Sequence, residues 1–391
     1  MLFALSKWPP SPQGLPTLSI VQDPDTTQMK GFAQPIVFFR LDLNLSLLVH
    51  SPAASASLRS LRIRIPGRVV VPALTVAYVN PDAPVPTTEY KFTVPPIEFL
   101  DLSTCNVSES DIEALLIRFA SLQHLVLDEC TSLLRGGPGP AMGQELEWWS
   151  GLGRRCALAG VKKARDREKR LKAWLEAQSH PLNEEEDSNT QVASDVPRRA
   201  RRGRRGLATA TISLRGASSP PRAGPSVVAS PSTSEKKTTT GVRASVKIHI
   251  VPPLPTLLSI CLHPTSRITT NPEVLPLIHA EFEAGWNDGI RVVWERRGRM
   301  GSTFLRGPTV GPKPRFLTFQ TGLYGRADYD EGFEGLEDVA VGDEGVFFQP
   351  DGAASGVRSA PILCLGGSSL DDGHAEGCGH TIAQAILLER L

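Results

Sequence analysis

The sequence predicts an α/β fold assembled from repeated strand–helix units. One apolar pattern occurs twice between residues 97 and 134, with equivalent positions 25 residues apart. Its members are Ile97, Leu100, Leu102 and Cys105 in the first copy, and Leu122, Leu125, Leu127 and Cys130 in the second. Four matches in one register indicate a repeat, and a period in the twenties is typical of stacked units that share one core.

In each copy the two middle leucines are separated by one residue, which suits a short strand with one buried face. The cysteine three positions later is expected to return to the core, where its thiol acts as a small apolar group that can donate to a backbone carbonyl. After Cys105 the spacing becomes helical, and Ser108 or Ser110 is expected to cap that helix. The apolar residues of this helix are Ile112, Leu115, Leu116 and Phe119.

Two weaker copies of the pattern precede this stretch, 20 residues apart. They are marked by Phe38, Leu41 and Leu43, and by Leu58, Leu61 and Ile63. We therefore predict a short, irregular repeat array over residues 36–143, after a loop-like N-terminus at residues 1–35. A hairpin-rich α/β domain with leucine-rich strands is the alternative.

The composition does not indicate a charged partner. The 391 residues include 42 Lys and Arg against 41 Asp and Glu, and six cysteines. Six cysteines in a chain of this length do not make a disulfide framework, and a core role for two of them favours a reducing compartment, nuclear or cytoplasmic. No apolar stretch is long enough to predict a membrane span.

Residues 144–182 predict a long, basic, amphipathic helix. Its apolar stripe is expected to cap the open end of the repeat stack. Its basic face is either solvated or binds an acidic partner or nucleic acid.

Residues 183–246 have the composition of a disordered linker. Six arginines lie within eight of its residues, namely Arg198, Arg199, Arg201, Arg202, Arg204 and Arg205. Such dense positive charge fits a nuclear-import signal, a nucleic-acid contact or a solubilising linker, and these three interpretations remain open.

Residues 247–391 are predicted to form a small α+β region with an acidic loop. A helix is expected from Asn271–Pro272 to Gly289, followed by a strand at residues 290–295. The acidic, glycine-rich tract at residues 327–345 is expected to fold back against the basic helix or the arginine run.

Four side chains near the C-terminus are suited to metal binding: Cys364, His374, Cys378 and His380. Thiolates and imidazoles are the ligands that zinc prefers. Their spacing matches no established zinc finger, so an ordered turn without metal is the alternative. The sequence carries no catalytic motif, phosphate-binding loop or dinucleotide fingerprint, and we expect no enzymatic activity.

The two L-x-x-L-x-L-x-x-C segments resemble leucine-rich repeats of the ribonuclease-inhibitor-like class. Together with the basic segment 152–176 and the ending HAEGCGH at residues 374–380, they are similar to the fungal F-box and leucine-rich-repeat proteins. The resemblance implies a curved surface that selects a target and a helical F-box that docks on a ubiquitin-ligase scaffold. No F-box is recognisable in this sequence.

We therefore expect a protein-interaction module whose partner surface lies between the core leucines. The residues expected to face outward there are Asp101, Ser103, His124 and Val126. The alternative is a nuclear nucleic-acid- or chromatin-associated protein that uses the arginine-rich segment.

Overall fold

A computed structural model describes the fold of the repeat region and of much of the C-terminal part. The described residues are 16–22, 45–46, 48–49, 54, 57–75, 94–130, 133, 142–179, 247–263, 273–307, 313–320, 332–348, 359–366 and 373–388.

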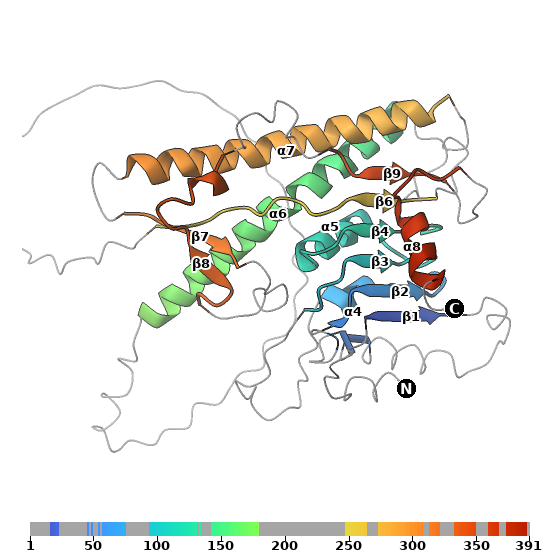
Figure 1. The fold of residues 1–391 in the computed structure, drawn as a ribbon, viewed down its shortest axis with the longest axis horizontal. Helices are drawn as coiled ribbons and strands as arrows, with labels where there is room; N and C mark the ends of the chain where they lie inside the picture. The colour runs from blue at the N-terminus through green and yellow to red at the C-terminus, as the bar shows by residue number, and fades with distance from the viewer. Residues whose placement is uncertain are drawn as a thin grey trace, which may run out of the picture. The chain divides into compact units, whose positions relative to one another are not determined.

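Six strands form a parallel sheet whose spatial order follows the chain (Figure 1). Every neighbouring pair is parallel, so each connection crosses back over the sheet before the next strand begins. The strands are β1 (Thr17–Val21), β2 (Ser60–Arg64), β3 (Phe99–Asp101), β4 (His124–Val126), β6 (Ser259–Cys261) and β9 (Ile362–Cys364). The predicted α/β class is confirmed at this level.

The two faces of the sheet are covered by different helices. The middle residues of β3, β4, β6 and β9 point into the main core, as do Leu61 and Ile63 of β2. They pack there with side chains from α4 (Val71–Thr75), α5 (Glu109–Arg118), α6 (Met142–Ser179) and α7 (Leu275–Arg306). The flanking residues of β3, β4, β6 and β9 point to the opposite face, because side chains alternate along a strand. There they contact α8 (Gly379–Leu388).

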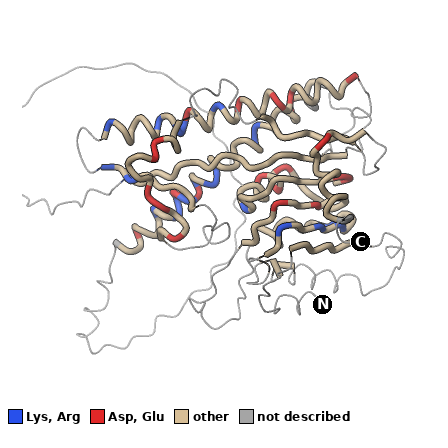
Figure 2. Tube along the Cα trace, viewed as in Figure 1, with Lys and Arg blue, Asp and Glu red and all other residues tan. Residues whose placement is uncertain are grey.

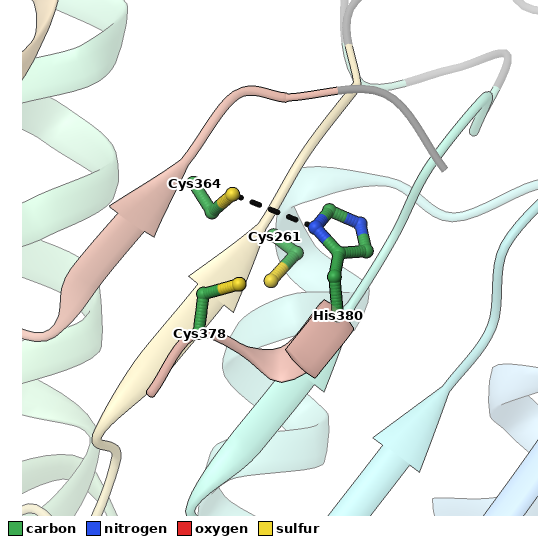
Figure 3. Close-up of side chains that lie close together, drawn as sticks. All are labelled: Cys261, Cys364, Cys378 and His380. Carbon is green, nitrogen blue, oxygen red and sulfur yellow. Dashed lines mark hydrogen bonds between the residues drawn. The ribbon is translucent and has the colours of Figure 1, made fainter. Parts of the chain in front are cut away.

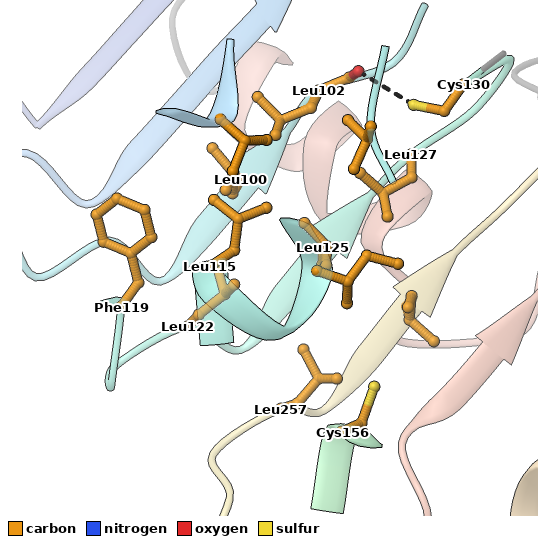
Figure 4. Close-up of a cluster of buried hydrophobic side chains, with 14 of the residues drawn as sticks. Leu100, Leu102, Leu115, Phe119, Leu122, Leu125, Leu127, Cys130, Cys156 and Leu257 are labelled. Atoms are coloured by element: carbon orange, nitrogen blue, oxygen red, sulfur yellow. Dashed lines mark hydrogen bonds between the residues drawn. The ribbon is translucent and has the colours of Figure 1, made fainter. Parts of the chain in front are cut away.

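All eight predicted repeat-core residues are buried, and Figure 4 shows most of them in one cluster with Leu115 and Phe119. Each cysteine also makes the expected contact with a carbonyl. The thiol of Cys105 donates to the carbonyl of Ile63 at 3.3 Å, and that of Cys130 donates to the carbonyl of Leu102 at 3.4 Å. Each thiol therefore joins one repeat unit to an earlier strand segment.

The residue before each repeat cysteine has a left-handed backbone. Thr104 has φ 67° and Glu129 has φ 57°, and these are equivalent positions 25 residues apart. Only glycine adopts this region without steric cost, and a β-branched residue is the least suited to it. The two copies of the sequence pattern therefore share a left-handed turn that neither Thr104 nor Glu129 favours.

Replacing Thr104 by glycine is expected to raise the free energy of unfolding by about 1 kcal/mol, because it removes the left-handed strain. The substitution also removes a buried hydroxyl that has no hydrogen-bond partner among the described residues. Denaturant unfolding of the full chain measures the change. Thr104→Ala removes the same hydroxyl but keeps the strain, so equal stabilisation by both variants would contradict this explanation.

The helix of the first repeat begins as the sequence predicts. Ser108 is its N-cap and accepts from the backbone N–H of Asp111, whose carboxylate accepts from the backbone N–H of Ser108. This reciprocal capping fixes where α5 starts, and the helix then places Ile112 and Leu115 in the core.

A second sheet of three strands packs beside the later half of α6. It contains β5 (Ile248–Ile250), β7 (Arg315–Phe319) and β8 (Leu336–Asp338), with β5 parallel and β8 antiparallel to β7, and a 3₁₀ turn follows at Glu344–Val346. The described part of the acidic tract contacts the basic helix here, because Arg167 donates to the carbonyls of Gly332 and Glu334 at 3.0 and 2.9 Å.

Three local predictions need correction. The region predicted as a loop-like N-terminus contains β1, which pairs with β2 along its whole length. The strand predicted at residues 290–295 is part of α7, because Ile290, Val293 and Arg297 continue the helical spacing of buried residues. The long basic helix was predicted to start at residue 144 and begins at Met142.

The predicted boundary at residue 246 does not separate two cores. Strands β6 and β9 come from the region predicted as α+β, and they extend the six-stranded sheet beyond β4. The segment 257–262 carries the same spacing as the repeat, since Leu257, Ile260 and Leu262 are buried with the repeat leucines. The residues before the linker and after it therefore build one sheet.

Figure 2 marks the charged residues along the chain trace. Basic residues of α6 are paired with acidic residues of α5 and α7. Lys162 binds Glu113 at 2.7 Å, Arg154 binds Asp288 at 3.2 Å, and Arg155 binds Glu109. Part of the predicted basic face is therefore neutralised within the chain. These exposed pairs contribute little stability individually.

Helices α6 and α7 cross at very short range, and glycines make this possible. A Cβ added at Gly153 would lie 2.1 Å from the carbonyl oxygen of Phe282, and one at Gly285 would lie 1.9 Å from that of Ser150. No side chain fits at either position, so the two backbones are in direct contact.

Some predictions lie outside the described residues. These are the first weak repeat copy at Phe38, Leu41 and Leu43, the linker, and the arginine run from Arg198 to Arg205. In the part of the chain that is described, no helix combines the length and apolar character needed to cross a bilayer.

Candidate metal centre

Three cysteines and one histidine converge at the end of the repeat sheet (Figure 3). The ligand atoms of Cys261, Cys364, Cys378 and His380 all lie within 4.8 Å of one another. All four residues are at most 6% exposed. The cluster could hold a metal ion.

The sheet register brings two of these cysteines together. Cys261 ends β6 and Cys364 ends β9, and they are direct partners across the two strands. Both occupy the outward position that Val126 holds in β4. The alternation of the strands thus directs both thiols to the face that α8 covers.

The other two side chains come from the start of α8. Cys378 immediately precedes the helix and His380 is its second residue. Between them lies Gly379, where an added Cβ would be 2.9 Å from a methyl group of Val126 and 3.0 Å from Cys261 Sγ. A glycine at this position lets the helix start close enough to the sheet for both side chains to reach the strand cysteines.

The spacing of the four ligand atoms is close to that of a tetrahedral zinc site. With Zn–S bonds of about 2.3 Å and Zn–N bonds of about 2.0 Å, neighbouring sulfurs lie roughly 3.8 Å apart and sulfur lies about 3.5 Å from nitrogen. Cys364 Sγ lies 3.5 Å from His380 Nδ1. Only a small contraction of the cluster is needed to complete the coordination.

Contacts inside the cluster favour ionised thiols. A hydrogen bond from Cys261, opposed by burial and assisted by His380 and His374, lowers the pKa of Cys364 to about 2. A hydrogen bond from the same thiol lowers the pKa of Cys378 to about 5. The bonds to both cysteines, together with burial, raise the pKa of Cys261 well above its usual range. These shifts favour the thiolate, the form in which cysteine binds metals.

The other buried thiols behave differently. Burial raises the pKa of Cys105 to about 11 and that of Cys156 to about 12. These cysteines stay protonated as small apolar core groups. Free cysteines are found at all six positions. Among these six, lowered thiol pKa values occur only in the cluster, at Cys364 and Cys378.

A carboxylate orients the histidine. Asp128 Oδ2 lies 2.7 Å from His380 Nε2, and its other oxygen accepts from the backbone N–H of His263 at 3.0 Å. Burial lowers the pKa of His380, but the bonds to Asp128 and Cys364 raise it more, to about 10. Because Nε2 is engaged by Asp128, Nδ1 is the nitrogen that faces the cysteines, as in carboxylate–histidine–metal triads.

Asp128→Asn is expected to weaken metal affinity by about 10- to 100-fold, because the amide no longer fixes the ring orientation or supports its basicity. Competition between the full chain and a chromophoric zinc chelator measures this affinity. Glu129→Gln changes the neighbouring carboxylate, which is exposed, and serves as the control. Equal affinities of the two variants would contradict a positioning role for Asp128.

The structure brings together three of the four predicted metal residues. His374 lies beside the cluster, with Nδ1 at 3.6 Å from Cys364 Sγ and its ring 4.7 Å from that of His380. Cys261 takes the fourth position instead. The sequence contained a signal for Cys261, since it stands between Ile260 and Leu262 as Cys364 stands between Leu363 and Leu365.

The residues predicted as a partner surface do not form an open surface. Asp101, Ser103 and Val126 are buried, and His124 is partly buried and lies 2.8 Å from Ser259 Oγ. Val126 belongs to the cluster of apolar side chains under α8. The strand periodicity correctly places Val126 away from the main core, but the prediction did not include a helix on that face.

Comparisons with models of known protein families, with curated proteins and with solved structures found no match to this chain. The fold and the site define an α/β protein with a parallel sheet and a buried Cys₃His cluster. The resemblance to F-box and leucine-rich-repeat proteins stays a prediction from the motifs.

Proposed function

We propose that the chain is a zinc-containing scaffold of the leucine-rich-repeat type that binds a protein partner and carries out no catalysis. The observation that supports this most directly is the closed ligand set of Cys261, Cys364, Cys378 and His380. Four buried protein ligands leave no coordination position for water or substrate, which is typical of structural zinc rather than catalytic zinc.

The repeat character of this proposal is supported by the parallel strands that follow chain order and by the 25-residue spacing of buried residues. Such stacks expose a broad sheet face for partner binding. A role as a substrate adaptor of a ubiquitin ligase follows from the sequence resemblance alone. Six free thiols fit a reducing compartment, nuclear or cytoplasmic.

The partner surface that we propose is the sheet face over β1 and β2. Arg62 and Arg64 share one carboxylate, Asp101, at 3.2 and 2.9 Å, and each arginine side chain is 25% exposed. Two guanidinium groups against one carboxylate leave a net positive charge. A partner segment with acidic side chains would complement it.

Two experiments test the proposal. Elemental analysis of the purified full chain is expected to find one zinc per chain, and a folded protein without metal would rule out the zinc centre. A photo-reactive residue at Ser19, which pairs with Arg62 in the sheet register, is expected to capture the partner in cells. The same residue at Ser302, exposed on α7, is the control, and capture at Ser302 alone would overturn the proposed surface.

A further inference from the structure

Helix α8 lies across the repeat sheet as a separate layer (Figure 1). Its side chains Ile382, Ala383 and Ile386 pack on Phe99 and Val126 rather than joining the main core. These three side chains are only partly buried. The apolar contact under α8 is therefore small beside the core that holds α5, α6 and α7.

The strongest connections between α8 and the sheet pass through the candidate metal centre. Cys378 and His380 at the start of the helix face Cys261 and Cys364 on the strands (Figure 3). Within the described residues, the pair of His380 with Asp128 is also the only ion pair that α8 makes. A metal bound by these four ligands would crosslink the helix to two strands.

The strip of sheet surface beneath α8, formed by Phe99 and Val126, is suited to a helical ligand. Phe99 is 5% exposed and Val126 is 1% exposed with α8 in place, and both project from the sheet face opposite to the main core. Removal of α8 would expose an aromatic and a branched aliphatic side chain at diagonal positions on adjacent strands. Arg62 and Arg64 lie on the neighbouring strand of the same sheet, so a helix with an apolar face and an acidic end would fit there.

We propose that α8 is a metal-clamped cover, and that the strip formed by Phe99 and Val126 is a docking surface for an amphipathic helix, closed while the metal is bound. This inference rests on the proposed zinc centre. With the metal in place, α8 occupies the strip. When the metal is withdrawn, the three aliphatic contacts and the pair of His380 with Asp128 do not offset the conformational entropy of the ordered helix, and the strip opens.

Hydrogen exchange on the full chain tests the clamp, with and without a strong zinc chelator. Removal of zinc is expected to lower the protection of residues 379–388 at least roughly tenfold and to leave residues 275–306 of α7 unchanged. Unchanged protection of α8 in zinc-free protein would overturn the clamp while leaving the zinc centre intact. Equal loss of protection in α7 would also overturn it, because zinc would then support the whole fold.

A peptide of residues 381–391 tests the docking surface, because it carries the aliphatic residues of α8 but neither metal ligand. It is expected to bind the zinc-free full chain at least roughly tenfold more tightly than the zinc-loaded chain. Val126→Asp should abolish this binding, whereas Leu277→Asp on the exposed side of α7 should not. Equal binding to both metal states would overturn the proposal, and a purified chain that binds no zinc would remove its basis together with the proposed function.

Discussion

Replacing Cys364 by serine is expected to abolish stoichiometric zinc binding and to cause the largest loss of stability of any single cysteine substitution in this chain. Cys364 contacts two other members of the cluster, Cys261 and His380, and it ends the last strand of the sheet. A structural metal present at about 1,000 times its dissociation constant stabilises the folded state by about 4 kcal/mol. The variant should lose a free energy of unfolding of that order.

Zinc content and denaturant unfolding of the full chain measure both effects. Cys156→Ser is the matched control, because Cys156 is equally buried but packs in α6 with the main core. The control should keep its zinc and lose about 1 kcal/mol, as expected for a polar atom placed in an apolar site. A Cys364→Ser protein that still binds one zinc would show that the cluster is not the metal site.

The strand and helix positions within residues 97–130 could be predicted because their signal is local. The apolar positions of residues 97–134 determine strand and helix within one unit, and the buried residues follow that pattern. The cap at Ser108 and the thiol–carbonyl contacts of Cys105 and Cys130 are also local consequences of the spacing. Short-range periodicity was therefore sufficient for this part of the fold.

The candidate metal site was only partly predictable, because its ligands come from distant segments. Cys378 and His380 lie close in sequence, whereas Cys261 is separated from Cys364 by more than a hundred residues. The two strand cysteines meet only because β6 and β9 are neighbours in the sheet. Reading Leu257, Ile260 and Leu262 as a further copy of the repeat would have placed Cys261 on the outward face.

The role of Asp128 could not be predicted from the sequence for the same reason. The sequence places it directly after the strand of the second repeat copy, where a polar residue needs no special explanation. Its contact with His380 spans 252 residues and depends on how α8 lies on the sheet. The helix that covers Val126 in the predicted partner surface was missed for this reason as well, since periodicity assigns a residue to a face but not to the element that packs on it.

Gly153→Ala is expected to destabilise the chain by about 3 kcal/mol, although alanine favours helices. The new methyl group would lie 2.1 Å from the carbonyl oxygen of Phe282 and 2.9 Å from the backbone nitrogen of Trp286. Both atoms belong to the backbone of α7, so no side-chain rotation can relieve the contact. The helices would have to separate, and Trp149, Phe282 and Trp286 would lose packing in the main core.

Gly151→Ala provides a control of opposite sign within the same helix. A Cβ at Gly151 meets nothing within 4 Å, so the substitution should stabilise α6 by about 0.5–1 kcal/mol through helix propensity alone. Thermal and denaturant unfolding of both variants separate the two effects, because intrinsic propensity predicts the same gain at both positions. If Gly153→Ala also stabilised the chain, α6 and α7 could not be in backbone contact at this glycine.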